Sequence, residues 1–329
     1  MKKLALLFIL LIAIFAVLIY LTVRQTASPP NASQITRYVP SAVPSQPASR
    51  DTRFDFAAYG DTRDGHSEHR KLVKHIIALN PELVINTGDL VHHGRKDQEW
   101  DIFMEIIETL AEKIPYYTIR GNHDTGRNNY EKRFAPPNDS GTNRYYTFDY
   151  KNVHFVGLDT NESAGVWREQ GRWLENALAT TDKPHIVVFF HHPPFGITNN
   201  RGDNNRIIKA FHNLFVKYNV NLVIAGHDHL YYRTNRDGVT YITTGGGGAP
   251  LYDVDPKLPH LPDDVWGKYH HIVHFTVAGR LIKGVVIDVD GKIRDSFALT
   301  SRRRIDSAKR VEQWGDVKAS NGTPTADGK

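Results

Sequence analysis

Residues 83–93 read Leu-Val-Ile-Asn-Thr-Gly-Asp-Leu-Val-His-His, an apolar run that passes into a glycine, an aspartate and two histidines. The run 83–87 is short and rich in β-branched residues, which is typical of a strand buried on both faces. The Gly-Asp pair after it is typical of a turn at a strand end. The same arrangement recurs where the run 54–59 precedes Gly60-Asp61-Thr62-Arg63 and the run 116–119 precedes Arg120 and then Gly121-Asn122-His123-Asp124. These stretches predict a sheet whose strands end in polar loops.

Apolar runs and amphipathic segments alternate along most of the chain. Further strands are predicted at 154–158, 186–190 and 222–225. Helices are predicted at 66–79, 97–112 and 170–180, where apolar residues recur on one face. After Gly226 the pattern predicts antiparallel strands at 231–243, 272–277 and 281–289. We therefore expect one α/β domain over residues 53–300, in which helices cover the sheets.

The N-terminal segment predicts a membrane anchor. Lys2 and Lys3 precede an uninterrupted apolar run over 4–23, and about 20 helical residues span about 30 Å, the thickness of the hydrocarbon layer. We interpret residues 1–23 as a signal anchor, a single transmembrane helix. The positive-inside rule then places the domain outside the cytoplasm, at the periplasmic or extracellular face of the cell membrane. Cleavage of the segment as a signal peptide, which would give a secreted protein, remains the alternative.

The two ends of the chain carry its excess of positive charge. The formal net charge is +5, yet residues 54–300 contain 28 basic and 31 acidic residues. Residues 24–52 form a predicted Pro/Ser-rich linker, and residues 301–329 a polar basic tail that begins with three arginines. No basic stripe interleaved with aromatic residues lies in the middle of the sequence, so we do not expect nucleic-acid binding.

The polar loops carry the residues from which we expect chemistry. The chain has 17 His and no Cys, which excludes thiolate metal sites and cysteine nucleophiles. Five loops after apolar strands carry Asp, Asn or His: Asp61, Asp89, Asn122 with His123, His191 with His192, and His227 with His229. Carboxyl ends of strands converge on one crevice in α/β sheets. Oxygen and nitrogen ligands without sulfur suit two divalent or trivalent ions such as Mn, Fe or Zn.

These five blocks, in this order, resemble the calcineurin-like metallophosphoesterases over most of 54–300. The purple acid phosphatase branch is most similar, because Gly60-Asp61 begins a Gly-Asp-x-Gly-like block and the stretches 145–149 and 245–252 also match. The resemblance implies a two-sheet sandwich flanked by helices and a dinuclear metal site. It does not extend to the anchor, the linker or the tail.

The resemblance also implies roles for individual residues. Asp61 and His229 would bind the first metal, Asp89 would bridge both, and Asn122, His191 and His227 would complete the second. His192 is the alternative to His191. His123 would face the substrate, where it stabilises the phosphoryl oxygens or protonates the leaving group. Asp124 would orient His123 or cap the loop.

Two positions depart from the family pattern. Arg63 stands where many members have a histidine ligand, and it could clamp a phosphate oxygen or pair with Asp64 or Glu68. His92 stands where purple acid phosphatases have the tyrosine ligand responsible for their colour. We predict that His92 supplies a nitrogen ligand to the first metal, with His93 or water as alternatives. The protein is then not expected to be purple.

The predicted function is a metal-dependent phosphohydrolase that cleaves phosphate esters by attack of a metal-bridging hydroxide. A phosphomonoesterase acting on a phosphorylated small molecule is the first interpretation. A phosphodiesterase acting on nucleotides or lipid head groups is an alternative, and so is a non-catalytic surface binding module. The four glycines at 245–248 follow a strand, so we expect them to allow a close approach of backbone near the metals.

Overall fold

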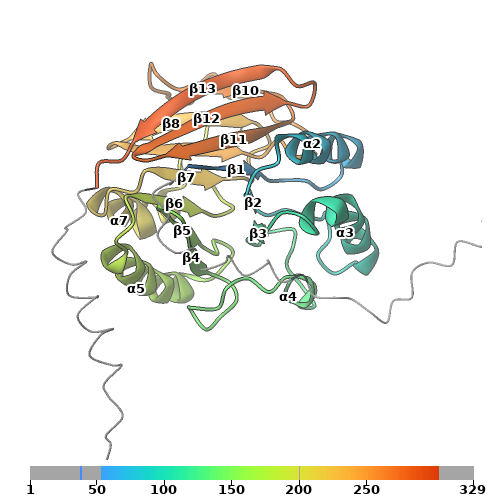
Figure 1. Cartoon of the computed structure of the whole chain (residues 1–329), viewed down its shortest axis with the longest axis horizontal. Coiled ribbons are helices and arrows are strands. Elements are labelled where there is room, and N and C mark those ends of the chain that lie inside the picture. Colours follow the sequence, from blue (N-terminus) through green and yellow to red (C-terminus); the bar gives the residue numbers. More distant parts are fainter. Residues whose placement is uncertain (1–37, 39–52, 200, 304–329) are drawn as a thin grey trace, which may run out of the picture. The chain divides into compact units, whose positions relative to one another are not determined.

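The computed structural model of the protein describes residue 38, residues 53–199 and residues 201–303. Within these residues the chain forms two mixed β-sheets (Figure 1). The first sheet has the strand order β13 (Ile293–Thr300), β12 (Leu281–Asp288), β11 (His271–Ala278), β1 (Phe54–Tyr59), β2 (Leu83–Asn86) and β3 (Tyr116–Thr118). The second has the order β10 (Val265–Gly267), β8 (Tyr231–Arg236), β9 (Val239–Thr244), β7 (Leu222–Ala225), β6 (His185–Phe189), β5 (Val153–Gly157) and β4 (Tyr146–Tyr150).

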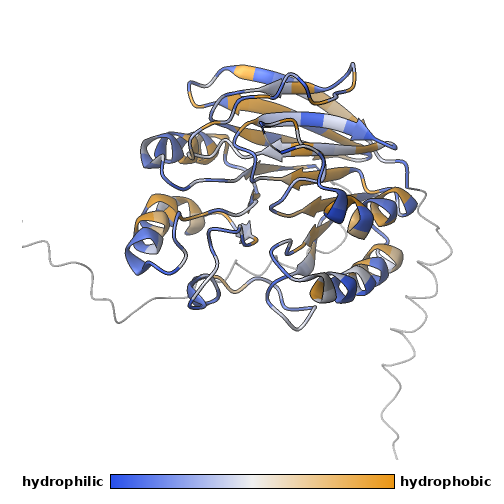
Figure 2. Cartoon of the chain, turned by 180° about the vertical axis from the view of Figure 1, so that it is seen from behind, coloured by the Kyte–Doolittle hydropathy of each residue, from blue (hydrophilic) through white to orange (hydrophobic). Residues whose placement is uncertain are grey.

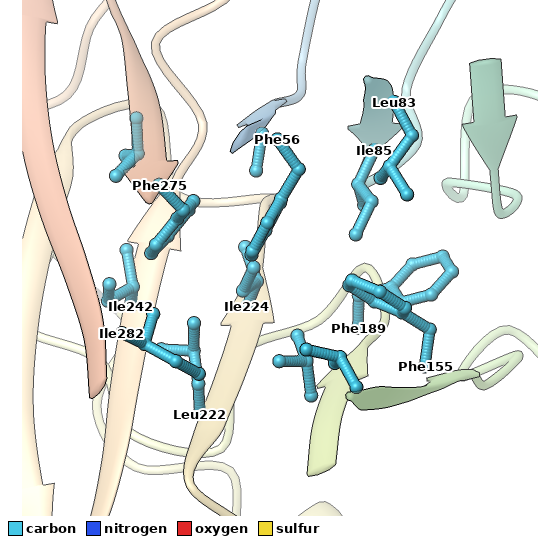
Figure 3. Close-up of a cluster of buried hydrophobic side chains, with 14 of the residues drawn as sticks. Phe56, Leu83, Ile85, Phe155, Phe189, Leu222, Ile224, Ile242, Phe275 and Ile282 are labelled. Carbon is cyan, nitrogen blue, oxygen red and sulfur yellow. The ribbon is translucent and has the colours of Figure 1, made fainter. Parts of the chain in front are cut away.

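The two sheets pack face to face because alternate side chains of each strand point into the shared core. In β1, Phe56 points into the sandwich, while its neighbour Ala57 contributes to the core on the other side of the sheet. Figure 3 shows Phe56 of the first sheet close to Phe155 and Phe189 of the second. The Phe56 and Phe155 rings meet edge to face, with centroids 5.3 Å apart. This layer fixes the distance between the two sheets, and hence between the loops at their ends.

Helices cover the outer faces of both sheets. Helices α2 (His66–Leu79) and α3 (Asp97–Ala111) pack on the first sheet, and α4 (Asn129–Arg133) lies beside its core cluster. The second sheet is covered by α5 (Ala164–Thr180) and by a segment made of α6 (Asn205–Ile207), η1 (Ile208–His212) and α7 (Asn213–Lys217). In Figure 2 the helices have one hydrophobic and one hydrophilic side, as expected for helices that each cover one face. The predicted α/β sandwich flanked by helices is confirmed.

Several elements differ from the sequence-based expectation. Helix α5 begins at residue 164 instead of 170. Its first turn contains Trp167, which is buried in the hydrophobic cluster between the second sheet and its covering helices. The helical segment 205–217 was not predicted, although Ile207, Phe211 and Phe215 recur every four residues. Strand β13 was also not predicted, because it lies at a sheet edge and alternates only between half-buried and exposed residues.

One residue of the predicted linker and one residue at the start of the predicted tail contact the domain. Tyr38, in the predicted linker, forms a bridge with Phe134, and its hydroxyl accepts a hydrogen bond from the backbone amide of Tyr116. Arg303 donates to the carbonyls of Thr181 and Tyr218. Among the described residues no helix is long and apolar enough to cross a bilayer. The predicted anchor at 1–23, the rest of the linker and the tail from 304 lie outside the described residues.

We expect Phe56→Ala to lower the free energy of unfolding by about 3–5 kcal/mol, because it leaves a cavity between two close-packed sheets. Urea unfolding followed by tryptophan fluorescence measures the change. Ile293→Ala is the control, since this side chain in β13 is 69% exposed and should change stability by less than about 0.5 kcal/mol. Equal effects of the two substitutions would contradict the assignment of Phe56 to the central core.

Candidate metal centre

The predicted ligand residues come together at the carboxyl ends of strands from both sheets. Asp61, Asp89 and Asn122 follow β1, β2 and β3 of the first sheet. His191 follows β6, and the loop with His227 and His229 follows β7, both in the second sheet. Residues from segments up to 168 positions apart in the sequence therefore share one site.

The ligand atoms of these residues lie within a few ångströms of one another. His191 Nε2 lies 3.3 Å from Asp89 Oδ1, 3.1 Å from Asn122 Oδ1 and 3.2 Å from His227 Nδ1. On the other side, His229 Nε2 lies 3.4 Å from Asp61 Oδ1. Ligand atoms of Asp61, Asp89 and His191 all fall within 4.8 Å of each other, which is a spacing that a metal ion can bridge.

Backbone carbonyls hold two of the histidines in the tautomer that metal binding needs. His191 Nδ1 donates to the carbonyl of Thr87 at 2.9 Å, and His229 Nδ1 donates to the carbonyl of Pro250 at 2.7 Å. A carbonyl oxygen only accepts, so a proton stays on Nδ1, and Nε2 is the nitrogen that faces the carboxylates and can bind a metal when it is deprotonated. This is the usual outer-sphere support of a histidine ligand.

The two carboxylates are buried and are only partly satisfied by hydrogen bonds. Asp61 Oδ2 accepts from the His227 amide at 2.8 Å, and Asp89 Oδ1 accepts from the His123 amide at 2.9 Å. Asp61 Oδ1 is buried and has no hydrogen-bond partner. A buried carboxylate oxygen without a donor is costly unless a cation faces it, so the residues present fit a metal ion.

The electrostatics of the site point the same way. Burial opposes ionisation of Asp89, but the adjacent His191 and the His123 amide hold its pKa well below the usual range. Burial also opposes protonation of His191, yet Asp89 raises its pKa to about 9. The pKa of His227 is lowered, first by burial and then by the charge of His191. The carboxylate charge in this pocket is thus large enough to retain a proton on a buried imidazole.

Three of the predicted ligands sit in backbone conformations that non-glycine residues rarely adopt. The φ angles of Asp61, Asp89 and His227 are 57°, 54° and 68°. Such left-handed conformations cost energy and tend to occur at functional sites. The backbone also approaches closely beside Asp61, where the amide of Gly247 donates to Gly60 O at 2.8 Å. The close approach expected of the glycines at 245–248 is confirmed.

Asp124 clamps two loops together, which settles one open alternative. Its Oδ1 accepts from the amides of Leu90 and Val91, and its Oδ2 accepts from the amide of Gly121. The ring of His123 is oriented by a different group, because His123 Nδ1 donates to the carbonyl of His92 at 2.7 Å. His123 Nε2 is then directed toward the site and lies 3.9 Å from Asp89 Oδ2.

The structure places the two departures from the family pattern side by side. Arg63 Nη1 donates to Asp64 at 2.5 Å, and its Nε lies 3.5 Å from Asp89 Oδ2. His92 Nδ1 donates to Asp64 Oδ1 at 2.8 Å, and His92 is not part of the clusters of ligand atoms found in the described residues. Its role as a first-metal ligand stays a prediction. His93 pairs with Glu99 at 2.9 Å.

Three further residues lie at the site, and the sequence assigned a role only to His192, as the alternative to His191. His192 Nδ1 forms a hydrogen bond with Thr160 Oγ1 at 2.8 Å. His192 also belongs to a second possible ligand cluster, with His191 and His227, so it remains an alternative metal ligand to His191. Tyr252 stacks on the ring of His229 with centroids 4.1 Å apart. Arg201 donates to the carbonyl of His227 at 3.2 Å. Tyr252 falls in the glycine-rich block singled out above, whereas no sequence pattern marks Arg201.

A cavity of about 330 Å³ is lined in part by His92, which contacts Arg63 and His123. Leu90 and Val91 form its apolar part. Its polar lining consists of Asp64, His66, His92, His93 and Glu99.

A sequence model of the calcineurin-like phosphoesterase family matches residues 54–231, more than half of the chain. The chain belongs to this family. Residues 61–229, which hold the ligand cluster, fall within the match.

The relatives of this calcineurin-like chain include acid phosphatases. Purple acid phosphatase 22 of Arabidopsis thaliana is 29% identical over 59% of this chain and 50% of its own length. Acid phosphatase type 7 of Mus musculus is 28% identical over 51% of this chain and 48% of its own length. The chain therefore spans about half the length of these curated relatives.

Two solved structures share the fold. A purple acid phosphatase from yellow lupin seeds superposes with a TM-score of 0.68 at 21% identity, covering 78% of this chain and 55% of the lupin chain. GAP50, an anchor in the inner membrane complex of Plasmodium, superposes with a TM-score of 0.63 at 17% identity. The match covers 80% of this chain and 94% of the GAP50 chain. At these identities the likeness is one of fold.

We expect Gly121→Ala to lower metal content sharply, because a Cβ at this position would overlap the backbone amide and Oδ1 of Asp89. Elemental analysis of the purified variant measures the metal bound per chain. Gly171→Ala in α5 is the matched control, since a Cβ there meets no atom within 4 Å and alanine favours a helix by up to about 1 kcal/mol. Full metal content in Gly121→Ala would contradict the close packing of this loop on Asp89.

Proposed function

We propose that this protein is a phosphomonoesterase that hydrolyses a phosphorylated small molecule at a dinuclear metal centre. The observation that carries the proposal is the convergence of Asp61, Asp89 and His191 ligand atoms within 4.8 Å, beneath a histidine that is not itself needed as a ligand. The similarity to purple acid phosphatases favours monoesters over diesters.

The residues that would hold the metals divide into two sets around Asp89. Asp61 and His229 belong to the first metal, with His92 as a further proposed ligand. Asn122, His191 and His227 belong to the second. When bound, the two ions lower the pKa of a water molecule and neutralise charge on the phosphoryl group. No serine or cysteine nucleophile is required.

His123 is suited to act on the substrate directly. Its Nδ1–H is committed to the His92 carbonyl, so only Nε2 is available on the open side of the site. The side chain is 29% exposed, whereas that of Asp89 beside it is 1% exposed. We assign His123 to hydrogen bonding with the phosphoryl oxygens or to proton donation to the leaving alcohol.

Arg63 is assigned to the phosphate group. A guanidinium offers two parallel N–H groups that match two phosphoryl oxygens. Its side chain lies between Asp64 and Asp89, so it is oriented toward the site without contacting bulk water extensively. The cavity next to it could accept the leaving group, with apolar contact at Leu90 and Val91 and hydrogen bonds from His66, His92 or His93.

The alternatives are a phosphodiesterase and a surface module without catalysis. The same fold occurs in the Plasmodium anchor, so the fold alone does not require turnover. The complete set of Asp, Asn and His ligands favours an enzyme, because a site under no catalytic constraint would have lost some of them. We also propose that residues 1–23 anchor the domain at the outer face of the cell membrane, or are cleaved to release it.

We expect Asp89→Ala to bind neither metal and to be inactive, since this carboxylate is shared by both proposed ligand sets. His123→Ala should keep two metals per chain and lose about 10²–10⁴-fold in kcat, the usual range for a positioned acid. The full-length chain, purified in detergent and loaded with Mn, Fe or Zn, is assayed on p-nitrophenyl phosphate and on bis-p-nitrophenyl phosphate. Metal content is measured on the same samples.

Arg70→Ala serves as the control in these assays. Arg70 lies on the exposed side of α2 and pairs with Glu105, so its loss should change neither metal content nor kcat. Faster turnover of the diester would favour the phosphodiesterase. Two bound metals with no turnover of either ester would favour the surface module, and full activity of His123→Ala would remove that residue from the mechanism.

A further inference from the structure

The guanidinium of Arg63 lies against two groups that the proposed function assigns to the first metal. Its Nε is 3.5 Å from Asp89 Oδ2, and its Nη2 is 3.5 Å from His229 Nε2. We infer that Arg63 and the first metal ion compete for these two ligand atoms, so that Arg63 weakens the first metal site relative to the second. This inference rests on the proposed dinuclear site.

Burial of the Arg63 side chain strengthens its electrostatic competition with the metal ion. The Arg63 side chain is only 10% exposed, and its Nε is buried without a hydrogen-bond partner. Water therefore does little to screen its charge, which the carboxylates of Asp64 and Asp89 compensate together. A divalent ion between Asp89 and His229 would lie a few ångströms from this fixed positive charge.

His229 Nε2 cannot serve both cations at once. His229 Nδ1 is held in its protonated form by Pro250 O, so Nε2 has a single lone pair in the plane of the ring. That lone pair faces either an N–H of Arg63 or a metal ion. Asp89 Oδ1 already accepts from the His123 amide, which leaves Oδ2 as the oxygen nearest to Arg63.

Asp64 gives the guanidinium a position outside the ligand set. It accepts from Arg63 Nη1 at 2.5 Å, and its side chain is 33% exposed, so it lies toward the open side of the site. When the first metal binds, Arg63 gives up its contacts with Asp89 and His229 and keeps the contact with Asp64. Nε and Nη2 of Arg63 then become available to a phosphate group. Arg63 can therefore compete with the first metal in the free protein and bind the phosphate of the substrate once that metal is bound.

The second metal site experiences less of this competition, because Asp89, which both sites share, faces His191 with Oδ1 and Arg63 with Oδ2. Among its proposed ligands, His191 contacts Asn122 and His227, while the close contacts of Arg63 go to Asp64, His92, Asp89 and His229. The two metals should accordingly bind in two separate steps. Removal of the Arg63 charge should raise affinity only in the weaker step.

The test is a titration of the metal-stripped full-length protein with Mn²⁺ alone, in which the electron paramagnetic resonance signal of free Mn²⁺ gives the bound amount. Wild type should bind two ions in two steps. Arg63→Gln, which keeps most of the length and removes the charge, should tighten the weaker step by about tenfold or more. Arg63→Lys keeps the charge and should resemble wild type.

A second variant changes Asp64, the residue that holds Arg63 away from the metal ligands. Asp64→Asn weakens the contact outside the ligand set, so Arg63 should remain on Asp89 and His229, and the weaker step should become about tenfold weaker still. Arg70→Ala should give the wild-type isotherm. Because the expected shifts have opposite signs, general loss of structure cannot produce both.

The outcomes separate this inference from the proposed function. Identical isotherms for wild type and Arg63→Gln, each with two bound ions, would overturn the competition and leave the dinuclear site intact. A tighter isotherm in Arg63→Gln together with a weaker one in Asp64→Asn supports the competition. If no variant binds Mn²⁺ and none hydrolyses p-nitrophenyl phosphate with any metal, the proposed function fails and the inference falls with it.

Discussion

The burial of two carboxylates at the junction of two sheets is the constraint on which the rest of the site depends. Asp61 and Asp89 each accept a hydrogen bond from the backbone of another loop, namely from the His227 and His123 amides. The first of these bonds joins a loop of one sheet to a loop of the other. The negative charge that they concentrate is compensated by histidines and by Arg63, and it creates the demand for metal cations. The aromatic layer between the sheets holds the loops at the separation that this arrangement needs.

Much of this arrangement was predictable because it repeats a simple local pattern. A buried strand produces a continuous apolar run, and the first polar residues after it must lie at the strand end, as Asp61, Asp89 and His227 do. The convergence of five such loops then follows from the sheet topology. Sequence patterns also predicted both ends of helix α2 correctly, and they predicted the close approach of backbone at Gly247. Family resemblance added the division of ligands between two metals, which spacing alone does not provide.

Other features depend on tertiary contacts that leave no local pattern. His92 pairs with Asp64, 28 residues away, and its orientation follows from that partner instead of from its place after β2. Arg201 reaches the site from a loop whose sequence resembles any polar connection. Tyr38 docks on Phe134 although its surroundings read as a spacer, because a single aromatic residue can bind a surface without any periodic pattern. Strand β13 was missed since an edge strand needs only one partner and half a buried face.

The carbonyl groups that orient His191 and His229 have a consequence for how the site tolerates sequence change. In many metal sites the group behind a histidine ligand is a carboxylate, which one substitution can remove. Here the acceptors belong to the main chain at Thr87 and Pro250, so replacement of either side chain leaves the oxygen in place. The tautomer of both ligands is thereby insulated from point mutation at those two positions. A substitution at either position can alter the tautomer only if it moves the backbone itself.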